Sequence, residues 1–291
     1  MLSEKPIAKD VATAQELLSY YHSKIPTDRV SWSVAENYRF VEMHVYAAEE
    51  IKKLGRILGF RGRFNRNIQA GWKYFETSWR KTPEYQGGFL LDGGVHFAAV
   101  LRMLLGDDEG KLEKVSAFTT QLREHLPPVD TANATLKCKS GVSGVFEMSV
   151  GTTFQGGGFA IACENGTVTV LRDSVATTNK EGQETTRDFR NEGFGGVKHE
   201  VRSWAEGMEN GKWNPRLRPE EALKDIEVVG RVVRRLCLSS RLTVFADRGS
   251  SSEWRARRCA CRAQAAIDNS SEGVLNHPHP FCATGTFSCG S

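Results

Sequence analysis

Two side chains in one short segment have the chemistry of an acid and a base. The segment from Gly87 to His96 reads Gly-Gly-Phe-Leu-Leu-Asp-Gly-Gly-Val-His, with Asp92 and His96 four positions apart. If a helix begins at or near Asp92, this spacing puts both side chains on one face. A carboxylate beside an imidazole can fix its tautomer, while the imidazole moves a proton near neutral pH. The alternative is that Asp92 caps the helix and His96 is a half-buried structural residue.

The sequence around this pair predicts how it is positioned. Val95, Ala98, Leu101 and Leu105 recur at helical spacing, and Gly106 is a typical helix stop. The glycines that come before the helix let the backbone lie close to a ligand, because they carry no side chain. The segment therefore reads as a candidate active-site helix.

A second segment, Glu4-Lys5-Pro6-Ile7-Ala8, lies far from the first in the sequence. In this order the two segments resemble the Gfo/Idh/MocA family of NAD(P)-dependent oxidoreductases, whose members carry an EKP motif and a GG-x-L-x-D-x-G-x-H motif. The resemblance runs from about Glu4 to about Leu238. Further matches are Asn37-Tyr38-Arg39-Phe40, Gly55-Arg56-Ile57 and Pro219-Glu220-Glu221-Ala222-Leu223-Lys224-Asp225.

The resemblance implies hydride transfer between NAD or NADP and a hydroxyl or carbonyl carbon of a sugar, polyol or related small molecule. His96 would take the hydroxyl proton as general base, and Asp92 would orient His96 and hydrogen-bond the substrate. Lys5 would hold the substrate oxygen. Glu4, Lys5 and Pro6 would also contact the cofactor.

Three further residues are expected to bind the substrate, namely Asn37, Trp79 and Arg80, whereas Arg39 is expected to serve the scaffold. Trp79 and Arg80 belong to a loop-rich stretch with several aromatic residues, which could stack on and clamp a polyol. The alternative is that this stretch covers a sheet edge or forms a subunit contact.

Residues 1–40 are interpreted as a remnant of a nucleotide-binding Rossmann domain, with one helix capped by Asp10 and one short strand at residues 30–34. A dinucleotide site needs a glycine-rich turn between a strand and a helix. No G-x-G-x-x-G motif stands in that context, and Gly156-Gly157-Gly158 is interpreted as a loop. We therefore expect a chain that lacks most of the Rossmann domain, with an unpaired strand in a segment that packs loosely on the second domain or pairs with another chain. The alternative function is a catalytically inactive structural or subunit-association module.

Residues 41–246 are expected to form an α+β domain, an open, mainly antiparallel β-sheet with helices on one face. A helix at residues 40–54 comes before the strands, which are predicted at residues 57–64, 114–122, 131–138, 142–150, 159–163 and 167–171. Two closing helices follow, and the apolar face of the first is Val197, Val201, Trp204, Ala205 and Met208. His199 and Glu200 on that helix are interpreted as a solvated surface pair.

Composition excludes some classes of protein. The chain has 291 residues, 40% of them hydrophobic, and a net charge of only +4, so no nucleic-acid partner is predicted. We find no run of about 18 apolar residues, predict no membrane partner and expect a cytoplasmic protein. The resemblance implies a homo-oligomer formed through the β-sheet. Residues 247–291 are expected to be a disordered, atypical tail, whose Cys and His spacings match no familiar zinc site, and no metal site is predicted.

Overall fold

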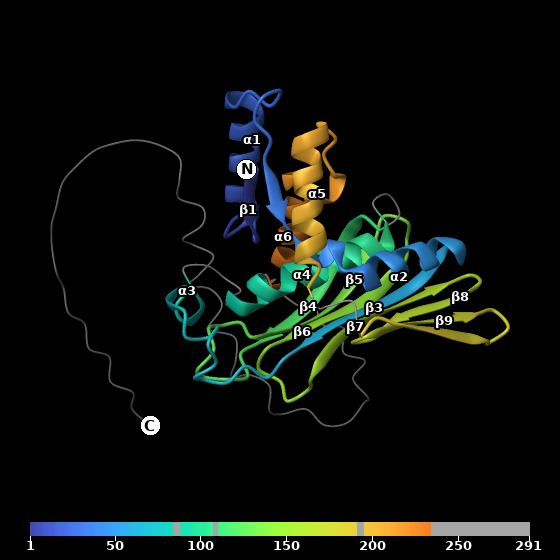
Figure 1. Cartoon of the computed structure of the whole chain (residues 1–291). Helices are drawn as coiled ribbons and strands as arrows, with labels where there is room; N and C mark the ends of the chain where they lie inside the picture. The colour runs from blue at the N-terminus through green and yellow to red at the C-terminus, as the bar shows by residue number, and fades with distance from the viewer. Residues whose placement is uncertain (84–87, 107–109, 191–194, 234–291) are drawn as a thin grey trace, which may run out of the picture. The chain divides into compact units, whose positions relative to one another are not determined.

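An eight-stranded β-sheet is the main layer of the protein (Figure 1). The computed structural model describes residues 1–83, 88–106, 110–190 and 195–233. The strands of the sheet are β3 (Ile57–Asn65), β4 (Leu112–Thr120), β5 (Thr131–Cys138), β6 (Ser143–Ser149), β7 (Gly156–Cys163), β8 (Gly166–Val170), β9 (Ser174–Asn179) and β10 (Glu184–Asp188).

The order of the strands is β10-β9-β8-β7-β3-β6-β5-β4. Every neighbouring pair is antiparallel except β3 and β6, which are parallel. Strands that follow each other in the chain and are joined by a tight turn become antiparallel neighbours. Strands β5 and β6 are an example, because a turn with Gly141 at φ +91° joins them into a hairpin. The predicted open, mainly antiparallel sheet is confirmed.

Within the described residues, helices α2 (Glu42–Lys53), α4 (Gly88–Leu105) and α6 (Pro219–Val233) lie on one face of the sheet (Figure 1). Helix α2 packs on β8 and β9, α4 on β3, β6 and β7, and α6 on β4 and β5. Their apolar side chains form one core with the inward-facing residues of the strands, such as Phe146 and Ile161, which are fully buried. Removing this apolar surface from water is the main stabilisation of the domain.

Helix α4 is the most apolar of the helices and corrects one expectation. Its 18 residues are long and apolar enough to cross a membrane by length and composition, although no such run was found in the sequence. In the structure 72% of this helix is buried inside the domain. A core helix surrounded by other elements is hydrophobic on all sides, so packing accounts for its composition.

Gly94 lets α4 approach the sheet and gives a first test of the packing. A Cβ atom at this position would lie 2.9 Å from Sδ of Met148 and 3.6 Å from Cγ2 of Val229. We expect Gly94→Ala to lower the free energy of unfolding by about 1 to 3 kcal/mol, because the core must expand. Urea denaturation measures this. The matched control is Gly230→Ala on α6, where the Cβ meets only Cγ2 of Val11 at 3.7 Å, and an equal loss there would contradict the packing described.

The N-terminal segment contains a second, two-stranded sheet. Strand β1 (Leu2–Glu4) pairs in parallel with β2 (Ser33–Ala35), so the prediction of one unpaired strand was wrong. Helix α1 (Val11–Lys24) connects them and packs on α6; as predicted, the Asp10 side chain caps it by accepting from the Thr13 amide. The chain after β2 enters a short 3₁₀ helix, η1 (Asn37–Phe40). Because β1 and β2 are parallel, Lys5 and Glu36, which directly follow them, lie at the same edge of this two-stranded sheet.

Other expectations need correction. Gly156-Gly157-Gly158 begins strand β7 and is not a loop. Strands β9 and β10 were not predicted. In helix α5 (Val197–Asn210) three residues of the predicted apolar face, Val197, Val201 and Met208, are exposed. The helix instead buries Glu200 and Gly207, and Gly207 lies against the ring of Trp213. The predicted tail at residues 247–291 lies outside the described residues.

Candidate active site

Lys5 and Asp92 are 87 positions apart in the sequence and form a direct ion pair. Nζ of Lys5 donates to Oδ1 of Asp92 and to its main-chain carbonyl, both at 2.8 Å. Lys5 follows the last residue of β1, and Asp92 lies in the N-terminal part of α4. The two motif segments therefore meet at one site, with both side chains mostly buried.

A second cation, Arg80, holds the other oxygen of Asp92. Nε of Arg80 donates to Oδ2 of Asp92 at 2.9 Å, from the short helix α3 (Ser78–Lys81). Burial alone would raise the pKa of Asp92, but Lys5 and Arg80 outweigh it and hold that pKa below its ordinary value. Asp92 is therefore a carboxylate at neutral pH. Its single negative charge faces two cations, Lys5 and Arg80.

His96 is oriented by Glu36, not by Asp92. Nδ1 of His96 lies 2.6 Å from Oε1 of Glu36, and the ring of Tyr38 stacks on the imidazole at 4.4 Å between ring centres. The expectation that Asp92 orients His96 was wrong. The spacing does put Asp92 and His96 on the same helix, but Lys5 and Arg80 already engage both oxygens of the Asp92 carboxylate.

Glu36 is fully buried and ionised. Burial opposes its charge, but His96, Arg39 and the main-chain amide of Tyr38 outweigh it, so the pKa of Glu36 lies below its ordinary value. A carboxylate can only accept, so Nδ1 of His96 carries a proton and donates it to Glu36. This leaves Nε2 of His96 as the nitrogen that can accept a proton. The signal for Glu36 in the sequence was an acidic residue directly after a short strand, where parallel strands place their functional groups.

The residues expected to bind substrate are placed differently. Arg80 lies at the site, and its guanidinium stacks on the ring of Trp79 at 3.9 Å. Trp79 itself is 42% exposed, so part of its ring is open to a ligand. Asn37 instead donates its side-chain amide to the carbonyl of Gly195, just before α5. Glu4 ends β1 opposite Ala35, and Pro6 follows Lys5.

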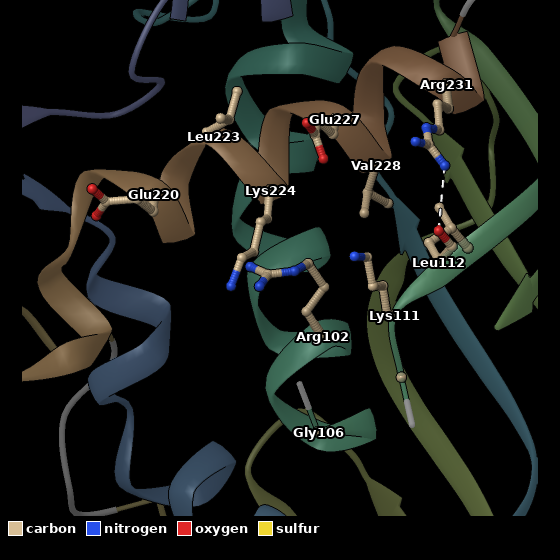
Figure 2. Close-up of a pocket in the computed structure, with 11 residues that line it drawn as sticks. Arg102, Gly106, Lys111, Leu112, Glu220, Leu223, Lys224, Glu227, Val228 and Arg231 are labelled. Carbon is tan, nitrogen blue, oxygen red and sulfur yellow. Dashed lines mark hydrogen bonds between the residues drawn. The ribbon is translucent and has the colours of Figure 1, made fainter. Parts of the chain in front are cut away.

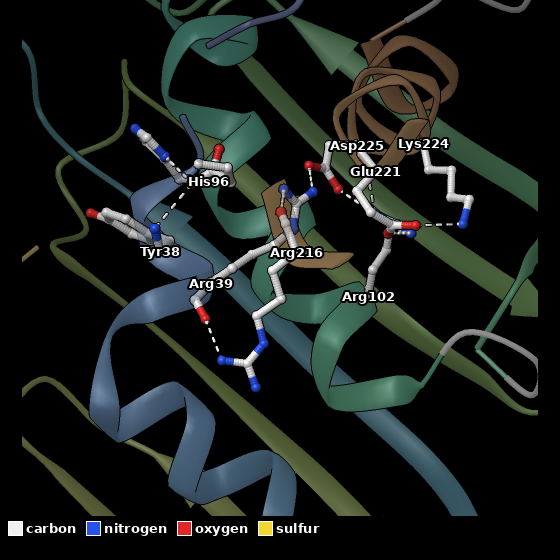
Figure 3. Close-up of polar contacts among 9 residues, drawn as sticks. Tyr38, Arg39, His96, Arg102, Arg216, Glu221, Lys224 and Asp225 are labelled. Atoms are coloured by element: carbon white, nitrogen blue, oxygen red, sulfur yellow. Dashed lines mark hydrogen bonds and ion pairs between the residues drawn. The ribbon is translucent and has the colours of Figure 1, made fainter. Parts of the chain in front are cut away.

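Arg39 serves the scaffold, as expected (Figure 3). Its guanidinium forms an ion pair with Asp225 of α6. Asp225 also accepts from Arg102 of α4 at 2.6 Å, and Arg102 pairs with Glu221 at 2.6 Å. These buried charges connect η1, α4 and α6, the three elements that carry or flank the site.

A cavity elsewhere in the domain contains none of the candidate catalytic groups (Figure 2). It has a volume of about 480 Å³ and lies between α6, the start of β4 and the C-terminal end of α4. Arg102, Lys111, Lys224 and Arg231 supply its cations, and Glu220 and Glu227 its carboxylates. Asp92 lies toward the other end of α4, so we do not assign chemistry to this cavity.

His199 and Glu200 on α5 do not form the solvated surface pair that was predicted. Glu200 is 3% exposed, so the prediction of a solvated side chain was wrong for this residue. His199 is partly exposed and faces Glu42 of α2 at 3.2 Å. The sequence missed the burial of Glu200 because a glutamate next to a histidine on a helix gives no sign of which side faces inward.

Comparisons with known proteins agree with this fold. Residues 43–169 match the model of the GFO/IDH/MocA C-terminal domain. Dehydrogenase FPY6 from Fusarium mangiferae is 36% identical over 236 residues, which cover 79% of this chain and 66% of that protein. The uncharacterized protein YMR315W from Saccharomyces cerevisiae is 35% identical over 174 residues, 58% of this chain and 47% of that protein.

Solved structures show the same architecture. An oxidoreductase from Thermotoga maritima has a TM-score of 0.69 and 27% identity, over 80% of this chain and 68% of that one. A levoglucosan dehydrogenase in complex with NADH and L-sorbose has a TM-score of 0.67 at 18% identity, over 80% of this chain and 69% of that one. The latter shows the fold alone.

The fold and the comparisons define a domain of the type found in oxidoreductases such as the Fusarium dehydrogenase and the Thermotoga enzyme. The chain belongs to the Gfo/Idh/MocA family, through the C-terminal domain that its residues 43–169 match. It spans 66% of the length of the Fusarium relative and 47% of that of the yeast relative.

Proposed function

We propose that this chain supplies the substrate and proton-transfer side of hydride transfer between NAD(P) and a hydroxyl or carbonyl carbon of a sugar, polyol or related small molecule. The observation that carries the proposal is the contact of Nζ of Lys5 with Oδ1 of Asp92 at 2.8 Å, with His96 one helical turn further along α4. The levoglucosan dehydrogenase among the structural neighbours, solved with NADH and L-sorbose, is consistent with this substrate class.

His96 is the proposed general base. Its Nδ1 proton is held by the ionised Glu36, so Nε2 is free to accept the proton of a substrate hydroxyl. The imidazolium that forms would be stabilised by the same carboxylate. In the reverse direction the imidazolium returns the proton to the oxygen of the reduced carbon.

Lys5 is the proposed oxygen-binding group. Asp92 faces two cations, Lys5 and Arg80, so one positive charge remains to stabilise a substrate oxygen that gains negative charge. Asp92 fixes the position of the Lys5 ammonium, and Trp79 offers an apolar ring beside Arg80. These groups suit a small polar molecule with hydroxyls and one apolar face.

The nicotinamide, when bound, accepts or supplies the hydride. Lys5, Asp92 and His96 fit the polar side of such a site. The sequence contains no G-x-G-x-x-G turn between a strand and a helix, so we assign no residue of this chain to the cofactor diphosphate. The proposal therefore concerns the proton and the substrate oxygen and leaves the choice between NAD and NADP open.

A binding and turnover experiment tests the proposal. NADH and NADPH are titrated into the purified chain by fluorescence, and oxidation of a panel of sugars and polyols is then measured. His96→Asn is expected to lower kcat by about 100- to 10,000-fold, because it removes the base, with cofactor Kd unchanged. His199→Asn, at a partly exposed histidine away from the site, is the matched control.

Two results would contradict the proposal for this chain. One is the absence of saturable binding at millimolar cofactor, which would favour the alternative of a structural or subunit-association module. The other is equal turnover of His96→Asn and His199→Asn, which would remove His96 from the mechanism.

The homo-oligomer implied by the family resemblance stays a prediction. Phe118 and Val145 are exposed, and the strand register puts both on the face opposite to the buried Phe146. We propose this face as the contact with a second copy, which sedimentation of the purified chain would test.

A further inference from the structure

Glu200 is a buried acid with an unsatisfied oxygen. It lies in the first turn of α5 and is 3% exposed, and its Oε1 has no hydrogen-bond partner among the described residues. Taking an ionised carboxylate out of water without a partner costs so much free energy that the group instead binds a proton. An orphaned carboxyl of this kind needs an explanation, because buried polar atoms in folded proteins are normally paired.

The position of Glu200 is fixed by a close approach of α5 to η1. Gly196 caps the helix at φ +66°, and a Cβ atom there would lie 2.3 Å from the carbonyl oxygen of Asn37. Only glycine fits such a contact. The Asn37 amide also donates to Gly195, so two contacts hold the start of α5 against the segment that carries Glu36.

Three charged groups act on Glu200, namely Glu36, Glu4 and Arg39. Glu4 at the end of β1 and Glu36 after β2 are like charges, and Arg39 of η1 is the opposing charge. Arg39 is already paired with Asp225, and Glu36 with His96. On α5 itself, Lys198 is exposed and His199 faces Glu42. No cation among the described residues is therefore committed to Glu200.

Burial, then Glu36 and Glu4, raise the pKa of Glu200 to about 8, and Arg39 only partly opposes them. The carboxyl is uncharged at neutral pH. Glu36, by contrast, stays ionised because it holds the Nδ1 proton of His96. Two neighbouring carboxyls in different charge states are a recurrent device for setting the proton affinity of a catalytic group.

We propose that Glu200 is a positioning residue for His96, which it serves by lying uncharged beside Glu36. A second carboxylate at this place would add negative charge behind the imidazole and raise the proton affinity of Nε2. His96 would then stay protonated and could not act as a general base. The catalytic role assigned to Glu200 rests on the function proposed for His96. The charge state of Glu200 and its electrostatic coupling to His96 do not depend on that function.

Nuclear magnetic resonance of the purified chain tests the coupling without cofactor or substrate. Glutamate carboxyl carbons and histidine ring carbons are labelled with ¹³C, and spectra are recorded from about pH 5 to about pH 10. Wild type is expected to show one carboxyl that titrates with a midpoint of about 8. The His96 signal, assigned with His96→Asn, is expected to show an extra inflection at the same midpoint.

Glu200→Gln is expected to remove both the carboxyl titration and the extra His96 inflection. Glu206→Gln, an exposed glutamate on the same helix, is the matched control and is expected to keep both. The inference is overturned if every glutamate of the wild type titrates in the ordinary range, a result that needs no variant. It is also overturned if the His96 titration is the same in wild type and Glu200→Gln. Failure of cofactor binding would leave both readouts intact.

Discussion

Asp225→Asn is expected to lower the free energy of unfolding by about 3 to 5 kcal/mol, because it leaves the buried Arg39 without a carboxylate and removes one of the two carboxylates that Arg102 contacts. Asp225 is 2% exposed and accepts from both Arg39 and Arg102 (Figure 3). Asparagine keeps the shape but not the charge, so the Arg39 guanidinium would lose its ion-pair partner, whereas Arg102 would keep its ion pair with Glu221. Urea denaturation at neutral pH, followed by tryptophan fluorescence, measures the loss.

The control for this variant is Asp173→Asn. Asp173 is exposed and lies 3.8 Å from the exposed Arg172, a pair expected to contribute less than about 1 kcal/mol. If Asp225→Asn cost no more than this control, the network that ties η1 to α4 and α6 would not be stabilising as described.

Glu200→Gln is expected to remove a large pH dependence of stability. The folded-state pKa of about 8 lies above the ordinary value of 4.5, so between these values the native state holds a proton that the unfolded chain releases. The stabilisation is fully present below about pH 4.5 and is lost as pH rises toward 8. This group therefore lowers the free energy of unfolding by about 1.4 kcal/mol for each pH unit in that window.

Urea denaturation at several pH values between 5 and 8 measures this slope. The stability of Glu200→Gln minus that of wild type is expected to rise steadily with pH and to level off above about 8. Glu206→Gln, whose side chain is exposed, should run parallel to wild type. If the stability of Glu200→Gln also ran parallel to that of wild type across this pH range, Glu200 would be ionised in the native state.

Local pattern was enough to predict most of the sheet. Strand β5 was predicted at its observed bounds, because its residues alternate between buried and exposed and a glycine turn follows it. Strand β10 was missed because all five of its residues are exposed, so no inward-facing set marks it. The three glycines of β7 looked like a loop. In the structure Gly157 leaves room for the ring of Phe97, a contact between elements that local sequence cannot show.

The sequence predicted the main residues of the candidate site but not which of them contact each other. Lys5 and Asp92 could be placed together only through the family resemblance, since 87 positions separate them. The four-residue spacing favoured Asp92 as the partner of His96, because spacing reports the face of a helix but not competing cations. Glu36 and Glu200 were missed for the same physical reason. Their importance comes from burial beside other charges, which depends on how β2, η1 and α5 pack.

The parallel pairing of β3 with β6 has a consequence for synthesis of the chain. Both neighbours of β3 in the sheet, β6 and β7, come from residues 143–163, roughly eighty or more positions later. Contacts this distant in sequence close slowly, because the entropy of ordering the intervening loop must be overcome first. During translation the central strand is therefore an open edge until the β7 segment has left the ribosome. In that interval a chaperone that covers exposed strands would protect Ile57–Asn65 first.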